Sequence, residues 1–338
     1  MQNIKKIISS LDNHKMFKLI EAKSIKKLIK NHRIIGYRND GIGSRLMTYV
    51  NLVRLSKKFN CKFIFYWDTR SDKNSPSYPH SLSTNINNYL PNLKNIKFYN
   101  SKNSKINNFS LQEWKIIVCK GEKKQRVLKE CSEIANKIFK NNSSKIKKNN
   151  IIYKYGLHLR LGDINAFTRR NYSKNKLISH RENFNLGKWY PSNFWIEICK
   201  KIDSKILVAS SDYRETTKIF KNFNNIKYCN KLVHKKENET YKFIFDIVSI
   251  SQTKNAICSL ASGSGLIICL LSKNNVFTPE AFLKIENIFF DFYEIILINY
   301  YKVNTMKSLI RHNIRYFLSK VFDFKLDFLS ELFKRSNN

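Results

Sequence analysis

The sequence predicts an α/β protein with two doubly wound halves, each a parallel sheet with helices on its faces. Two observations predict this fold class. Strand-like apolar segments alternate with helix-like segments through residues 33–139 and again through residues 151–278. In both stretches a turn rich in glycine and serine joins a strand to a helix, at residues 41–44 and 262–265.

Domain boundaries are predicted from shifts in composition. A polar, charged run at residues 140–150 separates the two halves, so we place a first domain at 1–149 and a second at 150–285. Residues 286–338 form a C-terminal tail that is aromatic, apolar and basic, with helical periodicity. We expect its helices to pack back on the first domain; a membrane-facing amphipathic segment is the alternative.

Composition limits the class of protein. A hydrophobic content of 42% in 338 residues indicates globular domains. The formal net charge of +37 favours anionic partners, but lysine is spread along the whole chain and no arginine-rich arm stands out, so we expect no nucleic-acid partner. Seven scattered cysteines without a CxxC pair indicate reduced thiols. No signal peptide or uninterrupted apolar run of membrane-spanning length is apparent.

The first glycine-rich turn is Asp40-Gly41-Ile42-Gly43-Ser44-Arg45-Leu46, inside a strand–helix–strand unit. Glycines here allow a tight turn and let an anionic ligand approach the N-terminus of the following helix. A dinucleotide site is an alternative, because Asp68 follows the second strand where a ribose-binding acid belongs. Against it, Leu46 stands where the third glycine of that fingerprint should be. A purely structural turn is the remaining alternative.

The second half is organised around a strand predicted at residues 151–161. His158 and Arg160 are two residues apart on it and therefore point to the same face. A guanidinium and an imidazole near the carboxyl end of a strand suit a phosphate-bearing ligand. Asp163 follows at the start of the next loop. The alternative is an edge strand with a weak surface ion pair.

The turn at Ser262-Gly263-Ser264-Gly265 repeats the arrangement of the first half, with small residues and hydroxyl groups before a helix predicted from Leu266. Asp212 follows another strand of the same sheet. Because ligands of such sheets bind beyond the carboxyl ends of the strands, we expect these residues to gather there with Arg160.

The remaining elements follow from periodicity and turn residues. We expect one or two amphipathic helices in residues 1–30, an irregular stretch at 69–112 and a loop over the site at 165–188. Strands are expected at 33–37, 61–67, 114–119, 205–209, 226–228, 255–260 and 275–278, and helices after Leu46 through about Phe59, at 122–139, at 190–201, from 213, and at 239–252.

These motifs together resemble the fucosyltransferase superfamily, which includes the α1,6-, nodulation-type and protein O-fucosyltransferases. The turn at residues 40–46 is similar to the family's early Gly-x-Gly-Asn-Arg-Leu loop, with Ser44 in place of Asn. Leu157-His158-Leu159-Arg160-Leu161-Gly162-Asp163 is similar to its His-x-Arg-Arg-x-Asp motif, with Leu161 in place of the second Arg. Residues 208–212 resemble the second motif, and Asp246 with residues 249–252 and 262–264 the third.

The resemblance implies a GT-B-like fold of two facing Rossmann-like domains and an inverting transfer of a sugar from a GDP-sugar without a metal or other cofactor. It implies Arg160 on the donor pyrophosphate with residues 262–264, and His158 and Asp246 near the guanosine. Asp40, Asp163 and Glu182 are the candidates for the base, and Arg160 is the group expected to stabilise the leaving phosphate. Residues expected to contact the donor are Gly41, Gly43, Arg45, His158, Arg160, Asp212, Asp246, Ser262, Gly263 and Ser264.

The function we expect is therefore transfer of a sugar, with fucose favoured, to a glycan or lipid-linked saccharide in polysaccharide biosynthesis. We expect a cytoplasmic protein with peripheral contact at the inner membrane. Three alternatives stay open: a nicotinamide-dependent oxidoreductase that uses the Gly41–Gly43 loop, a basic non-catalytic binding protein, and a degenerate relative that has lost activity.

Overall fold

The structure, a computed structural model, describes residues 16–30, 35–37, 41–66, 90, 93, 95–99, 111, 113–139, 153–161, 192–233, 239–260 and 262–283. All of them belong to one of two compact units of the chain, formed by residues 1–165 with 186–284. The other unit consists of residues 166–185 and 285–338. The tail, the loop expected over the site, and Asp40, Asp68, Asp163 and Glu182 lie outside the described residues.

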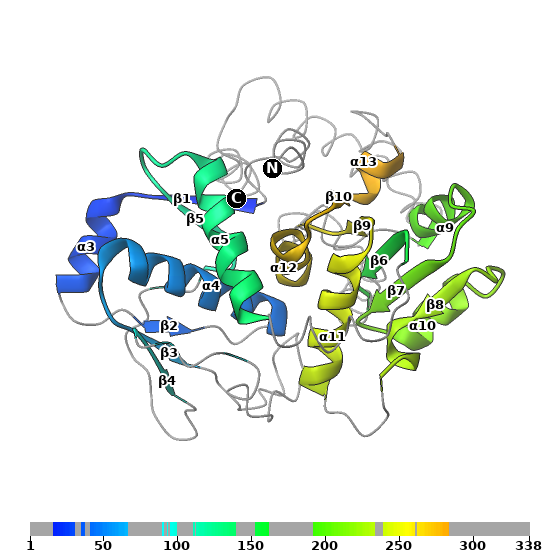
Figure 1. The fold of residues 1–338 in the computed structure, drawn as a ribbon, viewed down its shortest axis with the longest axis horizontal. Helices are drawn as coiled ribbons and strands as arrows, with labels where there is room; N and C mark the ends of the chain where they lie inside the picture. The colour runs from blue at the N-terminus through cyan, green and yellow to red at the C-terminus, as the bar shows by residue number, and fades with distance from the viewer. Residues whose placement is uncertain are drawn as a thin grey trace, which may run out of the picture. The chain divides into compact units, whose positions relative to one another are not determined.

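The second half of the chain forms a five-stranded parallel sheet in the order β10-β9-β6-β7-β8 (Figure 1). Its central strand is β6, and the chain first adds β7 and β8 on one side, then crosses to add β9 and β10 on the other. The connections on either side of β6 therefore diverge between β6 and β9, which is the place where doubly wound sheets bind ligands. The strands are β6 (Tyr155–Leu159), β7 (Ile206–Ser210), β8 (Ile226–Tyr228), β9 (Asn255–Cys258) and β10 (Asn275–Phe277).

Side chains alternate between the two faces of this sheet, and both faces are buried. Leu157, Leu159 and Val208 point to one face, and all three are fully buried. Gly156 and His158 point to the other, where the side chains of Thr253 and Ile250 at the end of α11 approach Gly156. The helices of this half are α9 (Ser192–Lys200), α10 (Tyr213–Ile219), η2 (Cys229–Lys231), α11 (Glu239–Gln252), α12 (Gly263–Leu271) and α13 (Pro279–Leu283).

The first half contributes two smaller parallel sheets. One contains β2 (Ile35–Tyr37), β3 (Phe63–Tyr66) and β4 (Ile96–Tyr99), and the other pairs β1 (Phe17–Ile20) with β5 (Ile116–Cys119). Its helices are α3 (Ala22–Lys30), α4 (Ile42–Phe59) and α5 (Lys124–Ile138). The predicted strand–helix–strand unit around the first glycine-rich turn is confirmed as β2-α4-β3.

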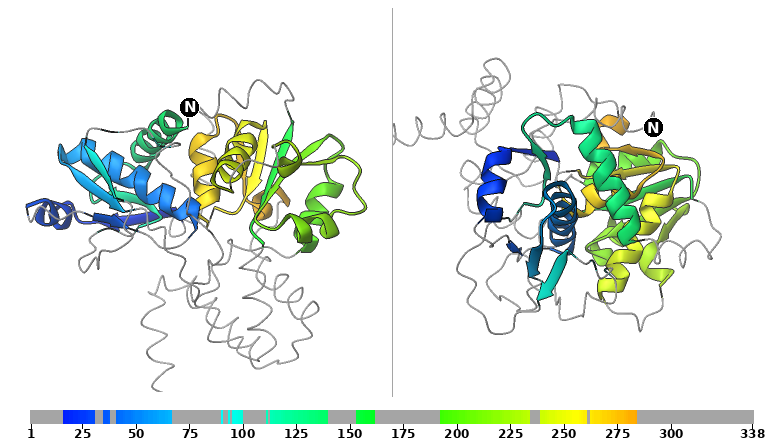
Figure 2. Two further views of the ribbon diagram at one scale, coloured as in Figure 1. Left: turned by 90° about the horizontal axis from the view of Figure 1, so that it is seen from below. Right: turned by 60° about the vertical axis from the view of Figure 1, so that its left-hand side comes forward.

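One hydrophobic cluster runs through both halves. It includes Leu46 and Val50 of α4, Val127 of α5, and Leu266 and Ile267 of α12, all almost fully buried. All nine residues of α12 are buried, because α4 and α5 cover one side of it and α11 another (Figures 1 and 2). The structure is thus mixed α/β with parallel sheets, as predicted, but the described residues do not divide into two separate cores. The predicted boundary at residues 149 and 150 stays a prediction.

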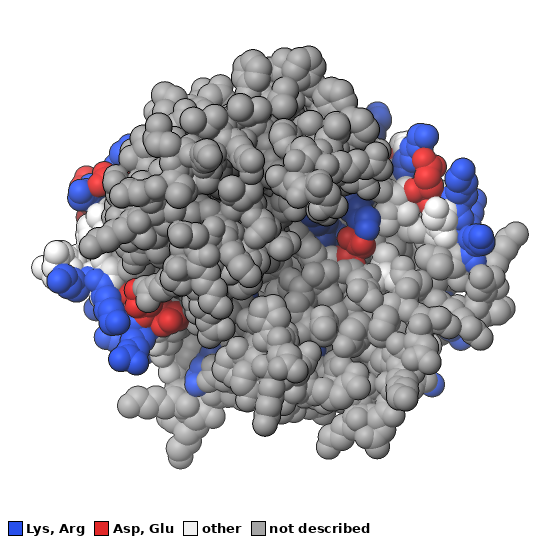
Figure 3. Space-filling view, turned by 180° about the vertical axis from the view of Figure 1, so that it is seen from behind, with Lys and Arg blue, Asp and Glu red and all other residues white. Residues whose placement is uncertain are grey.

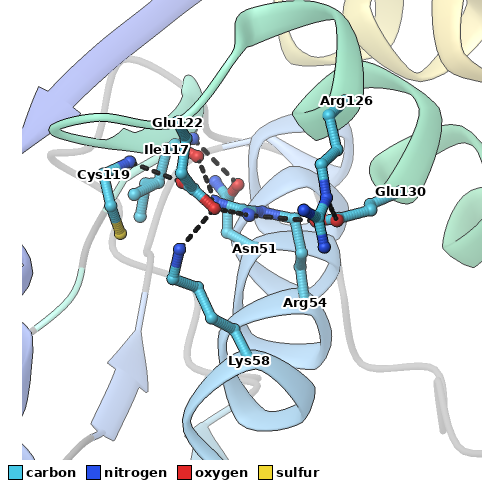
Figure 4. Close-up of polar contacts among 8 residues, drawn as sticks. All are labelled: Asn51, Arg54, Lys58, Ile117, Cys119, Glu122, Arg126 and Glu130. Carbon is cyan, nitrogen blue, oxygen red and sulfur yellow. Dashed lines mark hydrogen bonds and ion pairs between the residues drawn. The ribbon is translucent and has the colours of Figure 1, made fainter.

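A buried polar network fixes α4 to the first half (Figure 4). Arg54 is 2% exposed and donates to both carboxylate oxygens of Glu122, at 3.0 and 3.1 Å, and to the carbonyl of Ile117 at 2.6 Å. Glu122 also accepts from the backbone N–H of Cys119 and from Lys58. Although burial opposes ionisation, these donors lower the pKa of Glu122 from 4.5 to about 2.

Asn51, one turn before Arg54 on α4, extends the network along β5. Its amide donates to the carbonyl of Lys115 at 2.6 Å and its oxygen accepts from the N–H of Ile117 at 3.1 Å. A buried charged group such as Arg54 is stable only when it is paired and hydrogen-bonded. The network therefore fixes the long axis of α4, and with it the position of the first turn at Gly43.

The predicted C-terminal ends of the long helices hold to within a residue or so, whereas α4 begins at Ile42, before the expected start after Leu46, and several predicted strands are too long. The strand predicted at 151–161 forms β6 only over 155–159, and α12 begins at Gly263, three residues before the predicted start. Residues 17–20, expected in a helix, form β1 instead, because they pair with β5 in register from Phe17 with Ile116 to Ile20 with Cys119. Strand β4 was missed within the stretch expected to be irregular. All seven cysteines are free, and six of them are buried.

Candidate functional site

The site is built at the carboxyl ends of β6 and β9. His158 and Arg160 share a face of the β6 segment, as predicted from their spacing, because residues two apart on a strand point the same way. His158 pairs in register with Cys258 of β9 and is 5% exposed. Burial, and then the charge of Arg160, lowers the pKa of His158 from 6.5 to about 4. The imidazole is therefore neutral at physiological pH, and its Nδ1 atom has no hydrogen-bond partner among the described residues.

The first turns of α4 and α12 meet backbone to backbone. A Cβ atom placed on Gly43 would lie 2.3 Å from the backbone nitrogen of Ser264, and one placed on Gly263 would lie 2.2 Å from that of Ser44. Both distances are too short for any side chain, so this approach requires glycine on each helix. The two glycine-rich turns, which are more than 200 residues apart in the sequence, therefore form one structure.

Hydrogen bonds at the start of α12 fix its first turn. Ser262 is the N-cap residue, since its hydroxyl accepts from the N–H of Gly265 at 3.1 Å and donates to the carbonyl of Ser259 at 3.0 Å. The hydroxyl of Ser264 lies 3.2 Å from that of Ser262. Both serines are almost fully buried. The predicted phosphate-binding hydroxyl of Ser262 thus already serves as a helix cap.

Two helix N-termini and the guanidinium of Arg160 concentrate positive charge here. The first N–H groups of a helix have no acceptor within the helix and carry the positive end of its dipole. A Cβ on Gly41, the N-cap residue of α4, would lie 3.9 Å from Nη2 of Arg160, so the guanidinium reaches the start of α4. Arg45 lies in the first turn of α4 and is 3% exposed. This combination is suited to binding an anion with several oxygens, such as a diphosphate.

The two predicted aspartates lie on the β7 side of the sheet. Asp212 is the N-cap residue of α10, and its carboxylate accepts from the N–H of Glu215 at 3.0 Å. Helix capping therefore explains why an aspartate stands at this position. Asp246 on α11 accepts from the phenol of Tyr213 at 2.9 Å. Burial, together with the nearby Asp246 carboxylate, raises the pKa of Tyr213, so the phenol stays protonated and keeps donating.

The structure thus brings together Gly41, Gly43, Arg45, Arg160, Ser262, Gly263 and Ser264, and places His158 buried beside Arg160. It places Asp212 and Asp246 around α10 instead. Tyr213 was not predicted as a site residue, although its position directly after Asp212 at the start of a helix was a usable signal. In the described part of the chain, no group of three potential metal ligands occurs, and no helix is long and apolar enough to cross a membrane.

Comparisons with known proteins give a limited likeness, to solved structures and not to a family model. No family model matches the sequence, and no curated protein matches it. Among solved structures, the crystal structure of POFUT1 in complex with GDP matches with 11% identity and a TM-score of 0.28. The match covers 48% of this chain and 54% of that chain, about half of each. A likeness at this level does not establish an activity for the chain.

Proposed function

We propose that this protein is a glycosyltransferase that transfers a sugar from a GDP-sugar, with fucose as the favoured sugar, to a glycan or lipid-linked acceptor. The observation that carries the proposal is the meeting of the α4 and α12 N-termini beside Arg160, between β6 and β9. That is the ligand-binding position of a doubly wound sheet, and its charge matches a diphosphate. The choice of guanosine and of fucose rests on the sequence motifs that resemble fucosyltransferases.

Departure of GDP builds negative charge on its β-phosphate. In the proposed reaction Arg160 and the first N–H groups of α12 hold that charge, and they are already in place, so little reorganisation is needed as the bond breaks. This arrangement supplies the electrostatic role that a divalent cation has in other transferases. His158 is uncharged and contributes hydrogen bonding beside Arg160. Asp40 or Asp163 takes the proton of the acceptor hydroxyl, with Glu182 as a third candidate.

The test is calorimetric titration with GDP, in the presence of EDTA, for the wild type and two variants. Arg160→Ala removes the guanidinium at the site. Lys205→Ala removes an exposed positive charge just before β7, at the amino end of the strands of the same sheet, whereas the proposed site lies at their carboxyl ends. A hydrogen bond to a charged group contributes roughly 1.5–3 kcal/mol, so we expect Arg160→Ala to weaken GDP at least about tenfold and Lys205→Ala to leave it unchanged.

Titrations with UDP and NAD determine whether the ligand class is correct. We expect GDP to bind more tightly than either, and release of GDP from GDP-fucose to proceed with EDTA present. Binding of NAD without GDP would instead support the nicotinamide-dependent alternative. Binding of GDP that is equally strong in the wild type and in Arg160→Ala would show that the diphosphate lies elsewhere.

A further inference from the structure

A second charged surface lies away from the proposed donor site, on α3 and the turn after β5. Lys23, Lys26 and Lys27 are exposed and share one face of α3, because residues three and four apart lie above one another on a helix. Ile25, on another side of the helix, is 3% exposed. The helix is thereby anchored by an apolar side chain while it presents a row of three ammonium groups to solvent.

The β5–α5 turn adds further lysines to the same surface. The N–H of Lys120 donates to the carbonyl of Ile20 at 3.0 Å, which places the turn beside the start of α3. Lys120 is 80% exposed, and Lys123 is exposed as well. In Figure 3, which views the molecule from behind, blue side chains lie along the right-hand edge, the side on which α3 lies, and a second blue group lies at the left-hand edge, the side of α10 and β8.

Acidic neighbours offset only part of this charge. Glu21 pairs with Lys120 at 3.2 Å, and Glu113 pairs with Lys18. Within the described part of the chain, no acidic side chain forms an ion pair with Lys123 or with the three lysines of α3. We define the α3 patch as Lys18, Leu19, Lys23, Lys26, Lys27, Lys120 and Lys123. Its unbalanced positive charge is complementary to an anionic surface.

Leu19 decides which kind of anionic surface fits. Its side chain is 68% exposed, and it lies in β1, between Lys18 and Lys23 in the sequence. Among the described residues, Leu19 and Leu232 are the large apolar side chains that are exposed. An exposed aliphatic side chain that lies between lysines along the sequence is suited to the headgroup region of a bilayer. Single-stranded nucleic acid would call for exposed aromatic rings. The aromatic ring here, that of Phe17, is buried, with Lys124 5.5 Å from its centroid.

We propose that the α3 patch docks the protein peripherally on an anionic lipid bilayer, with the lysines at the headgroups and Leu19 inserted among them. A lysine near such a surface contributes about a fivefold gain in partitioning, so the three lysines of α3 together contribute about 100-fold. The docking does not depend on the donor site, because the patch shares none of its residues.

The test is sedimentation of the full chain with vesicles of phosphatidylcholine containing phosphatidylglycerol, and with vesicles of phosphatidylcholine alone. The first variant carries Lys23→Gln, Lys26→Gln and Lys27→Gln. The matched control carries Lys218→Gln, Lys221→Gln and Lys227→Gln, which remove the same net charge from exposed positions on α10, on the turn that follows it and on β8. Because charges farther than a Debye length are screened at physiological salt, the control lysines should contribute little.

We expect the wild type to bind only the anionic vesicles, the α3 variant to bind about 100-fold more weakly and the control within about threefold of the wild type. Leu19→Ser should weaken binding about tenfold while the thermal midpoint is unchanged, since the side chain is largely exposed. Three outcomes would overturn the proposal: no binding of the wild type to anionic vesicles, equal losses in both triple variants, or loss of single-stranded RNA binding in the α3 variant while vesicle binding persists.

Discussion

Substitution of Gly43 by alanine tests the contact between α4 and α12. Alanine is normally preferred to glycine in a helix by up to about 1 kcal/mol, so an isolated helix would gain stability. Here the added Cβ would lie 2.3 Å from the nitrogen of Ser264 and 2.7 Å from the carbonyl carbon of Gly263. Ordinary contact begins near 3.4 Å, so the two backbones would have to separate by about 1 Å. Such overpacking costs roughly 1–3 kcal/mol, and a backbone neighbour that cannot rotate away places this site at the upper end, about 2–3 kcal/mol. After the gain in helix propensity, a net loss of about 1–2 kcal/mol remains.

Equilibrium unfolding in urea measures this loss as a lower midpoint at an unchanged slope. Gly41→Ala is the matched control in the same turn, because its Cβ would meet only the end of the Arg160 side chain, at 3.9 Å. Because alanine is less favourable than glycine at an N-cap position, we expect that variant to lose about 0.5–1 kcal/mol, less than Gly43→Ala. A Gly43→Ala protein as stable as the wild type, or more stable, would refute the backbone contact and with it the common site formed by the two helix starts.

Three further outcomes are expected. Glu122→Gln should lower the free energy of unfolding by roughly 2–3 kcal/mol at pH 7, because it removes the carboxylate that accepts two hydrogen bonds from the buried guanidinium of Arg54 and leaves Glu130, at 3.2 Å, as the remaining carboxylate partner in the described part of the chain; urea unfolding measures this loss. His158 should titrate near pH 4 in NMR spectra of the folded protein, so GDP affinity should not follow imidazole protonation between pH 6 and 8. Tyr213→Phe should cost about 1–2 kcal/mol of stability in thermal or urea unfolding, because it removes the hydrogen bond to Asp246.

The pH dependence of stability follows from two depressed pKa values. His158 has a folded pKa of about 4, below its ordinary value of 6.5, so its contribution is present above pH 6.5 and is lost as the pH falls from there to 4. The pKa of Glu122 is lowered from 4.5 to about 2, so the stability that this carboxylate contributes is present above pH 4.5 and is lost as the pH falls from 4.5 to 2. A Glu122→Gln variant should therefore show a shallower loss of stability below pH 4.5. An unchanged profile below pH 4.5 would contradict the role given to its ion pair.

Much of the fold was predictable because local signals and tertiary structure agree. Helix α4 ends at Phe59 as predicted, and β8 spans the predicted Ile226–Tyr228. The predictions were wrong where tertiary pairing overrides local pattern. Phe17–Ile20 has the lysine content of an amphipathic helix, yet it forms a strand because β5 offers it an open edge.

The candidate site was predictable in composition and not in geometry. Spacing alone placed His158 and Arg160 on one face, and turn chemistry marked both glycine-rich segments. The need for Gly43 and Gly263 to touch could not be read from either segment, because it depends on a partner more than 200 residues away. The Arg54–Glu122 pair was missed for the same reason, since a helical arginine normally indicates a solvated face.

The burial of α12 on all sides determines how the protein can be dissected. A fragment that starts after residue 150 would contain the whole five-stranded sheet, but it would expose the side of α12 that α4 and α5 now cover. Its apolar residues, from Leu266 to Leu271, would then face water and favour aggregation. Chimeras that exchange one half for that of another protein would need to exchange the facing surfaces of α4, α5 and α12 together. The two halves should therefore be expressed and engineered together, because they share the core around α12.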